Sequence, residues 1–109
     1  MVIYSPGTVF IANVPFEDGR SGKRRPVVLV GNPGYWNHDL RALICPVTTA
    51  SPRPGVVRLD WRGAGLLQPS CVRPRPIIVP KRRLRWELGA IRMEDLDALL
   101  SALRHVLGL

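Results

Sequence analysis

Proline and glycine interrupt this sequence so often that most of it can form only short regular elements. Its 109 residues include 11 prolines and 10 glycines, and short apolar segments lie between them. Short apolar segments bounded by Pro and Gly are typical of β-strands in a small all-β core. We predict a compact, strongly bent barrel with strands at residues 8–14, 26–31, 42–48, 56–60, 70–73 and 77–79.

Several of the predicted strands are continuously apolar. Residues 27–30, for example, read Val-Val-Leu-Val. Alternation of apolar and polar residues would indicate a strand with one face in water, whereas an unbroken apolar run indicates burial on both faces or at a seam between two copies of the chain.

The end of the chain has a helical period instead. Apolar residues recur at positions 96, 99, 100, 103, 106 and 107, which lie on one face of a helix. We predict a helix over Met93–Leu107 that caps the barrel. Arg104 and His105 complement the dipole at its C-terminal end, and Gly108 is a suitable stop.

Length and charge limit the functions that this chain can have. At 109 residues it is long enough for one domain, spanning residues 1–109, and too short for two cores. Its formal net charge is +8, and residues 1–93 carry 15 basic and 5 acidic side chains. This balance favours a polyanion or an acidic protein as the partner.

Two cysteines, Cys45 and Cys71, are too few for a disulfide scaffold, and we expect both to be buried as small apolar side chains. No set of Cys and His residues has metal-ligand spacing, so we expect no metal and no cofactor. The apolar stretches are too short to span a membrane, and the N-terminus lacks a basic leader. We therefore expect a cytoplasmic protein without a membrane partner.

Polar groups stand at the ends of two of the predicted strands. A basic turn leads through Arg25 into the first of them, and the second ends in the hydroxyls of Thr48, Thr49 and Ser51. Strand ends hold side chains still enough for catalysis or for binding a phosphate.

Three other segments have both a functional and a structural interpretation. The glycine-rich loop at 16–24 is expected to be mobile and to gate a groove. The loop at 32–39 contains the aromatics Tyr35 and Trp36 among polar groups, which suits stacking on unpaired bases, although we favour Trp36 packing back on the barrel. His38 lies in the same loop, and we favour a plain loop histidine. The basic run at 81–85 is more often a solvated connector than a nucleic-acid contact.

The order of these pieces resembles the MazF/PemK (Kid) family of toxins from type II toxin-antitoxin systems. The matching motifs are residues 8–14, 23–30, 45–51, 65–70 and 88–91, so the resemblance covers almost the whole chain. It implies a small SH3-like (PemK/CcdB-like) β-barrel, usually a homodimer. It also implies sequence-specific, metal-independent cleavage of single-stranded RNA, and silencing by a cognate antitoxin, for which we expect an acidic, flexible C-terminal segment.

The resemblance also assigns residues to the site. Arg25 corresponds to the family's catalytic Arg, and Thr48 to its catalytic Thr. A basic groove beside them is expected to bind RNA through Arg20, Lys23, Arg24, Thr49, Ser51 and Ser70. Where some members carry an acidic residue in the gating loop, this chain has Arg20 or Ser21, so an acid-dependent mechanism is not implied.

The chemistry of the two catalytic candidates agrees with RNA cleavage. When the substrate's own 2′-OH attacks, the protein needs only to move protons and stabilise a charged phosphorane, and a guanidinium fork suits the second task. The general base is left open, because Arg is almost always protonated and Thr is a poor base. Two alternatives from other classes are a CcdB-like toxin that poisons DNA gyrase and a non-catalytic RNA-binding module.

Overall fold

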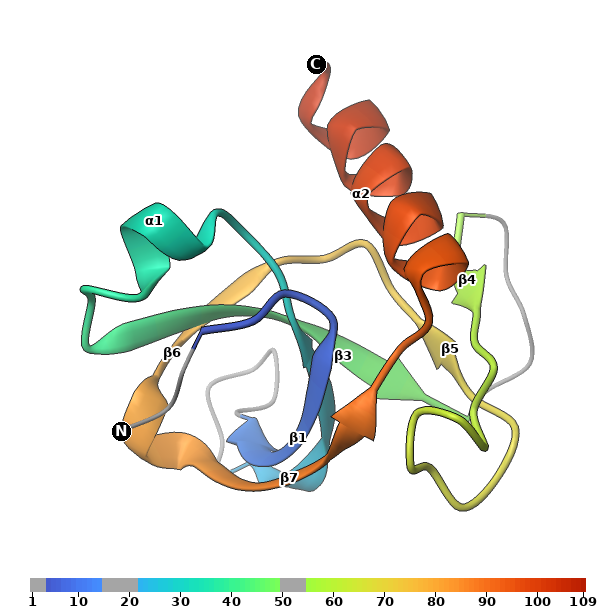
Figure 1. Ribbon diagram of the computed structural model, residues 1–109, viewed down its shortest axis with the longest axis horizontal. Helices are drawn as coiled ribbons and strands as arrows, with labels where there is room; N and C mark the ends of the chain where they lie inside the picture. Colours follow the sequence, from blue (N-terminus) through green and yellow to red (C-terminus); the bar gives the residue numbers. More distant parts are fainter. Residues whose placement is uncertain (1–3, 15–21, 50–54) are drawn as a thin grey trace.

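The computed structural model describes residues 4–14, 22–49 and 55–109 (Figure 1). Its strands are β1 (Thr8–Val14), β2 (Lys23–Leu29), β3 (Arg41–Thr48), β4 (Val57–Arg58), β5 (Cys71–Val72), β6 (Ile77–Pro80) and β7 (Leu84–Ala90). Its helices are the single turn α1 (Pro33–Trp36), the 3-10 turn η1 (Lys81–Arg83) and the long C-terminal α2 (Met93–Leu107).

The seven strands form one bent antiparallel sheet in the order β4-β5-β3-β2-β1-β7, with β6 paired to β3 beside this path. The predicted mainly β fold with a C-terminal helix is confirmed. The predicted barrel needs a correction, because the hydrogen-bonded sheet of the described residues does not close between β6 and β7. The strand β6 pairs with β3, and β7 pairs with β1. The turn η1 joins β6 to β7, so these two strands are consecutive in sequence but do not pair with each other.

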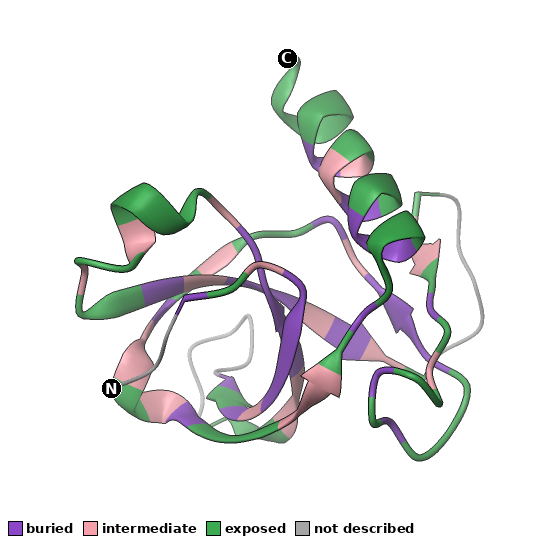
Figure 2. Cartoon of the chain, in the orientation of Figure 1, coloured by how far each residue is buried: buried purple, intermediate pink, exposed green. Residues whose placement is uncertain are grey.

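Apolar side chains cover both faces of the sheet. On the inner face, Phe10, Val27 and Ile44 belong to a core enclosed by the bend of the strands. On the outer face, Val28 and Cys45 belong to a second core together with α2. Figure 2 shows buried residues along the strands and on the side of α2 that faces them. The continuously apolar strands are therefore buried on both faces, which is one of the two predicted explanations.

The helix α2 has the predicted bounds, and Gly108 ends it in the left-handed conformation. Leu99 is fully buried, and Leu96 and Leu103 are nearly so. The final turn departs from the prediction, because Val106 and Leu107 are exposed. Figure 1 shows the reason: the C-terminal half of α2 extends beyond the sheet.

Five of the six predicted strands differ from the observed bounds by one to three residues at an end, and one strand, β7, was missed. The strand β2 begins at Lys23 rather than at residue 26, so that Lys23 and Arg24 lie in a strand and not in the predicted loop. The ladder segments β4 and β5 are only two residues long. The basic run at 81–85 was interpreted as a connector, but it forms η1 and then the start of β7.

Tyr4 holds together the corner where β2 passes into α1 and β3. Its side chain is buried, and its hydroxyl lies 2.5 Å from the Val30 carbonyl oxygen and 2.9 Å from that of Leu43. The same oxygen accepts the Leu43 N–H at 3.0 Å. One hydroxyl thus satisfies backbone groups of two segments that are distant in sequence.

We expect Tyr4→Phe to lower the free energy of unfolding by about 1–3 kcal/mol, because it leaves the partly buried Leu43 N–H without this acceptor. Urea titration of the purified variant measures the loss. Tyr35→Phe is the control: Tyr35 is 63% exposed, and its change should stay within about 0.5 kcal/mol. Equal stability of the two variants would show that the Tyr4 hydroxyl contributes nothing.

Both cysteines are free and buried, as predicted. Cys45 lies opposite Val28 in the ladder between β2 and β3, within the outer-face core. Burial raises the pKa of its thiol from 9.0 to about 12, although a backbone hydrogen bond from Arg75 opposes this shift. Burial likewise raises the pKa of Tyr4 from 10.0 to about 12.

These shifts predict a loss of stability at alkaline pH. Below pH 9 both groups are protonated in the folded and the unfolded chain, so their contribution to the free energy of unfolding is fully present there. Between pH 9 and 12 the unfolded chain releases the Cys45 proton first, so the free energy of unfolding falls as pH rises. We expect Cys45 to contribute a loss of about 1 kcal/mol between pH 8 and 10. Urea titrations at both pH values test this, and Cys45→Ala should show a smaller decrease than the wild type.

Candidate active site

The ends of β2 and β3 bring the two catalytic candidates together. The ladder between these strands pairs Val27 with Pro46. Continuing the same register by two residues places Arg25 opposite Thr48. On its other side Arg25 is paired with Ala12 of β1. Residues opposite each other share a face of the sheet, so Arg25 and Thr48 lie on the inner face, at the rim of the core that contains Ala12.

Arg25 has an unusual environment for an arginine. Its side chain is half-buried, and Nε is shielded from water without a hydrogen-bond partner among the described residues. Such buried donors are rare because an unmade hydrogen bond costs free energy. A phosphate at the strand end would supply the missing acceptor.

Thr48 is fixed by a second ladder. It is half-buried and pairs with Cys71 of β5. The loop before β5 is tied to α2 through Asp95, whose buried carboxylate accepts the Asp60 N–H at 2.8 Å and pairs with Arg92 Nε at 3.2 Å. This anchor was missed at the sequence level, because Asp95 has the same pattern as any acidic residue in the first turn of a helix.

The other predicted RNA contacts differ in their placement. Lys23, Arg24 and Thr49 are exposed at the same strand ends. Ser70 is buried, and its hydroxyl donates to the Gln68 carbonyl at 2.8 Å, which is a local turn contact. Arg20 and Ser51 lie outside the described residues, as does most of the predicted gating loop.

The aromatic loop lies away from this site. It precedes Arg41, at the opposite end of β3 from Thr48. Trp36 packs against the inner-face core, as favoured from the sequence. Gly31 makes this possible, because a Cβ there would come within 2.6 Å of the Trp36 ring. His38 is exposed in this loop, and His105 is exposed on α2. Neither histidine belongs to the strand ends that hold Arg25 and Thr48.

Trp86 was missed as a residue of this region. It lies in β7 opposite Ile11, and the Arg24 guanidinium carbon is 5.5 Å from the centre of its ring. The motif at 88–91 was recognised, but the Trp that precedes it was not. A signal was present in the alternation of Leu84, Trp86 and Leu88, which is typical of a strand.

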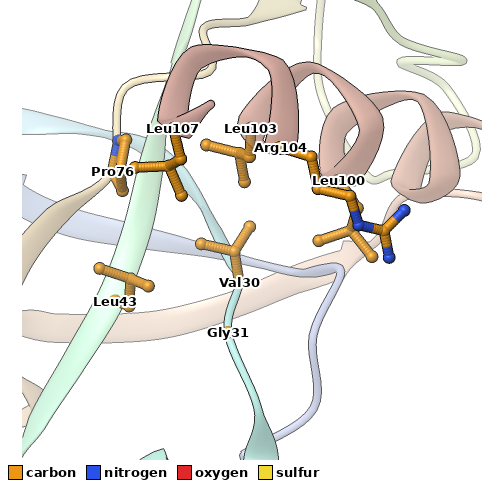
Figure 3. A pocket seen from close by; sticks show the side chains of 8 residues that line it. All are labelled: Val30, Gly31, Leu43, Pro76, Leu100, Leu103, Arg104 and Leu107. Carbon is orange, nitrogen blue, oxygen red and sulfur yellow. The ribbon is translucent and has the colours of Figure 1, made fainter. Parts of the chain in front are cut away.

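Two cavities lie elsewhere on the molecule. One of about 190 Å³ separates the C-terminal half of α2 from the sheet (Figure 3). It is lined by Val30, Gly31, Leu43, Pro76, Leu100, Leu103, Arg104 and Leu107. A shallower one of about 550 Å³ is lined by His38, Asp39, Leu40, Arg41, Pro80 and Arg82.

Within residues 4–14, 22–49 and 55–109, no three His, Cys, Asp or Glu side chains are grouped so that they could hold a metal ion. None of the helices in the described part of the chain is long and apolar enough to cross a membrane.

The fold and the strand end define a class of protein: a small, basic β-sheet domain with a half-buried arginine at the end of a strand. The family model for PemK-like, MazF-like toxins of type II toxin-antitoxin systems matches residues 5–107, and the chain belongs to this family. The resemblance seen in the motifs is thereby confirmed. A search among curated proteins found no match.

Solved structures agree with this assignment. The Mycobacterium tuberculosis toxin MazF-mt6 is 25% identical, with a TM-score of 0.76 over 94% of this chain and 97% of its own. An endoribonuclease in complex with its cognate antitoxin, from a Mycobacterial species, is 19% identical, with a TM-score of 0.80 over 100% and 97%. MazF in the MazE-MazF complex from Deinococcus radiodurans is 19% identical, with a TM-score of 0.80 over 99% of both chains. The two solved chains that are 19% identical to this one show similarity of fold alone.

Proposed function

We propose that this chain is a metal-independent, sequence-specific endoribonuclease toxin that cleaves single-stranded RNA in the cytoplasm. The observation that carries the proposal is the ladder between β2 and β3, because its register, when continued by two residues, puts Arg25 opposite Thr48. Arg25 Nε is also buried without a hydrogen-bond partner among the described residues. Family membership supports it, since a similar solved chain of this fold is described as an endoribonuclease.

The proposed reaction uses the substrate's own nucleophile. The 2′-oxygen attacks the adjacent phosphorus, the bond from phosphorus to the 5′-oxygen breaks, and the products carry a 2′,3′-cyclic phosphate and a 5′-OH. The proton of the 2′-OH leaves as the new bond forms, and a proton is returned to the departing 5′-oxygen. This route requires no metal, because the phosphorane charge can be stabilised by hydrogen-bond donors alone.

Each catalytic candidate has a role in this reaction. Arg25 donates to the non-bridging phosphate oxygens, with a planar fork that matches their geometry. Thr48, on the same face, donates its hydroxyl to the same phosphate. Lys23 and Arg24 neutralise neighbouring phosphates from exposed positions at the strand end. Thr49, with Arg20 and Ser51, completes the proposed contacts, whereas Ser70 is buried and its hydroxyl donates to the Gln68 carbonyl.

Two protein partners belong to this proposal. A cognate antitoxin with an acidic, flexible C-terminal segment would occupy the basic groove, as complexes of similar proteins with an antitoxin suggest. A second copy of the chain would form a homodimer. Exposed apolar side chains at the end of α2, Val106, Leu107 and Leu109, favour burial of this surface in an assembly.

Incubation of the purified protein with a long single-stranded RNA in excess EDTA tests the proposed function. We expect discrete fragments that reflect a preferred sequence. A parallel supercoiling assay with DNA gyrase addresses the alternative toxin mechanism. RNA that is bound but left intact would contradict the enzyme and favour the RNA-binding module.

A further inference from the structure

Trp86 is exposed although it lies within a strand. It leaves 47% of its surface accessible, whereas Trp36 and Trp61 are half-buried against the inner-face and outer-face cores. A single exposed apolar side chain is common on protein surfaces. The backbone and the charges around Trp86 distinguish it from such a case.

The backbone of β7 is irregular on both sides of Trp86. The ladder between β1 and β7 shifts register between Val9 and Phe10, and again between Ile11 and Ala12. Trp86 and Glu87 occupy the short regular stretch between the two shifts. Bulges of this kind bend a strand and redirect its side chains, and they are frequent beside functional sites. In Figure 1, β7 runs along the outside of the sheet, and its residues Arg85, Trp86 and Glu87 are exposed.

A cation lies over the Trp86 ring. Arg24 is exposed and paired with Asn13, two residues along β1 from the partner of Trp86. Its guanidinium carbon is 5.5 Å from the ring centre, within the range of a cation–π contact. Two flat groups, an indole and a guanidinium, are therefore held together on the outer face of the sheet.

This pair is next to the proposed catalytic arginine. Arg24 and Arg25 are neighbours in β2, and their side chains leave opposite faces of the same strand end. A strand of RNA whose phosphate lies at Arg25 can therefore place an adjacent unpaired base over the edge of the sheet, beside Arg24 and Trp86. Planar aromatic and guanidinium surfaces are what unpaired bases stack on.

We propose that Trp86 and Arg24 form a stacking site for an unpaired RNA base next to the phosphate that is cleaved. The proposal rests on the proposed function, because it takes the Arg25 site as the place of cleavage. The Arg24 guanidinium places a positive charge against the exposed ring, and this favours RNA over an apolar protein surface as the occupant.

Binding of a 2′-O-methylated RNA oligonucleotide, which resists cleavage by 2′-OH attack, tests the stacking site apart from catalysis. We expect Trp86→Ala to weaken affinity about tenfold or more, and Trp86→Phe to retain most of it. Arg24→Ala should weaken affinity, and Arg62→Ala is its matched control. Arg62 is also exposed and lies over a tryptophan, at 4.9 Å from the centre of the Trp61 ring, but it belongs to the loop between β4 and β5.

Fluorescence gives a second measurement that does not depend on a loss of affinity. In the variant Trp36→Phe/Trp61→Phe, Trp86 is the only tryptophan, and the RNA should quench its emission on binding. Sedimentation of Trp86→Ala at the same concentrations reports whether the variant assembles like the wild type.

Three results would overturn the stacking site: equal affinity of Trp86→Ala and wild type, unchanged Trp86 emission on RNA binding, or dissociation of Trp86→Ala into monomers. The last would identify this face as an interface between copies. If RNA quenches Trp86 emission in Trp36→Phe/Trp61→Phe but the wild type leaves unmodified RNA intact, the stacking site is supported and the proposed cleavage is contradicted.

Discussion

Replacing Arg25 with alanine is expected to slow RNA cleavage by about a hundredfold or more at saturating substrate. Loss of one preorganised donor to a developing oxyanion typically costs this much. Arg25 is half-buried at the strand end, and its Nε–H has no acceptor among the described residues. Arg25→Lys should recover little activity, because an ammonium lacks the two-pronged geometry of the guanidinium. Separate measurement of kcat and KM distinguishes these effects.

Arg24→Ala is the matched control for this experiment. Arg24 is the preceding residue in the same strand and has the same charge, but it lies on the outer face with Asn13. We expect its loss to raise KM and to leave kcat within about threefold of the wild type, as for a group that binds substrate and transition state equally. If both variants lost activity in proportion to RNA affinity, Arg25 would be only an electrostatic contact.

The second large effect is expected from a partner protein. A cognate antitoxin with an acidic, flexible tail should abolish cleavage when present in a one-to-one ratio, because the tail competes with RNA for the basic strand end. Lys23 and Arg24 are exposed there, beside the half-buried Arg25. Opposite charges speed encounter, and salt screens that attraction, so association should slow as ionic strength rises.

Deletion of the acidic tail from the partner is the decisive variant. The tail is expected to become ordered on binding and to cover the groove. The truncated partner should still bind, but it should inhibit cleavage much less. Equal inhibition by the truncated and intact partners would show that the tail does not occupy the strand-end groove.

The sequence determined some parts of this structure more firmly than others. The bounds of α2 were predicted correctly, because its apolar residues repeat with one helical period and Gly108 follows them. The strand β7 was missed, because a basic run leads into it and two register shifts interrupt its alternation. Side-chain period is a local signal, whereas bulges depend on the partner strand.

The candidate site shows the same distinction. Arg25 and Thr48 were assigned by resemblance to a family, and no local pattern relates two residues so far apart in the chain. Their proximity follows from the ladder that pairs Val27 with Pro46, which is a property of the folded sheet. The buried Ser70 hydroxyl and the exposed Trp86 could not be told apart from other Ser and Trp residues by sequence, because burial depends on the elements packed around them.

The central claim is that Arg25 and Thr48 serve an RNA whose own 2′-OH attacks the phosphate. The most direct measurement compares two RNAs of one sequence that differ only in a 2′-O-methyl group at the cleaved nucleotide, with fragment ends mapped in excess EDTA. We expect the unmodified RNA to yield a 2′,3′-cyclic or 3′-phosphate and a 5′-OH, and the modified RNA to remain intact. Cleavage of the modified RNA at the same position, or fragments with 5′-phosphate ends, would contradict this mechanism.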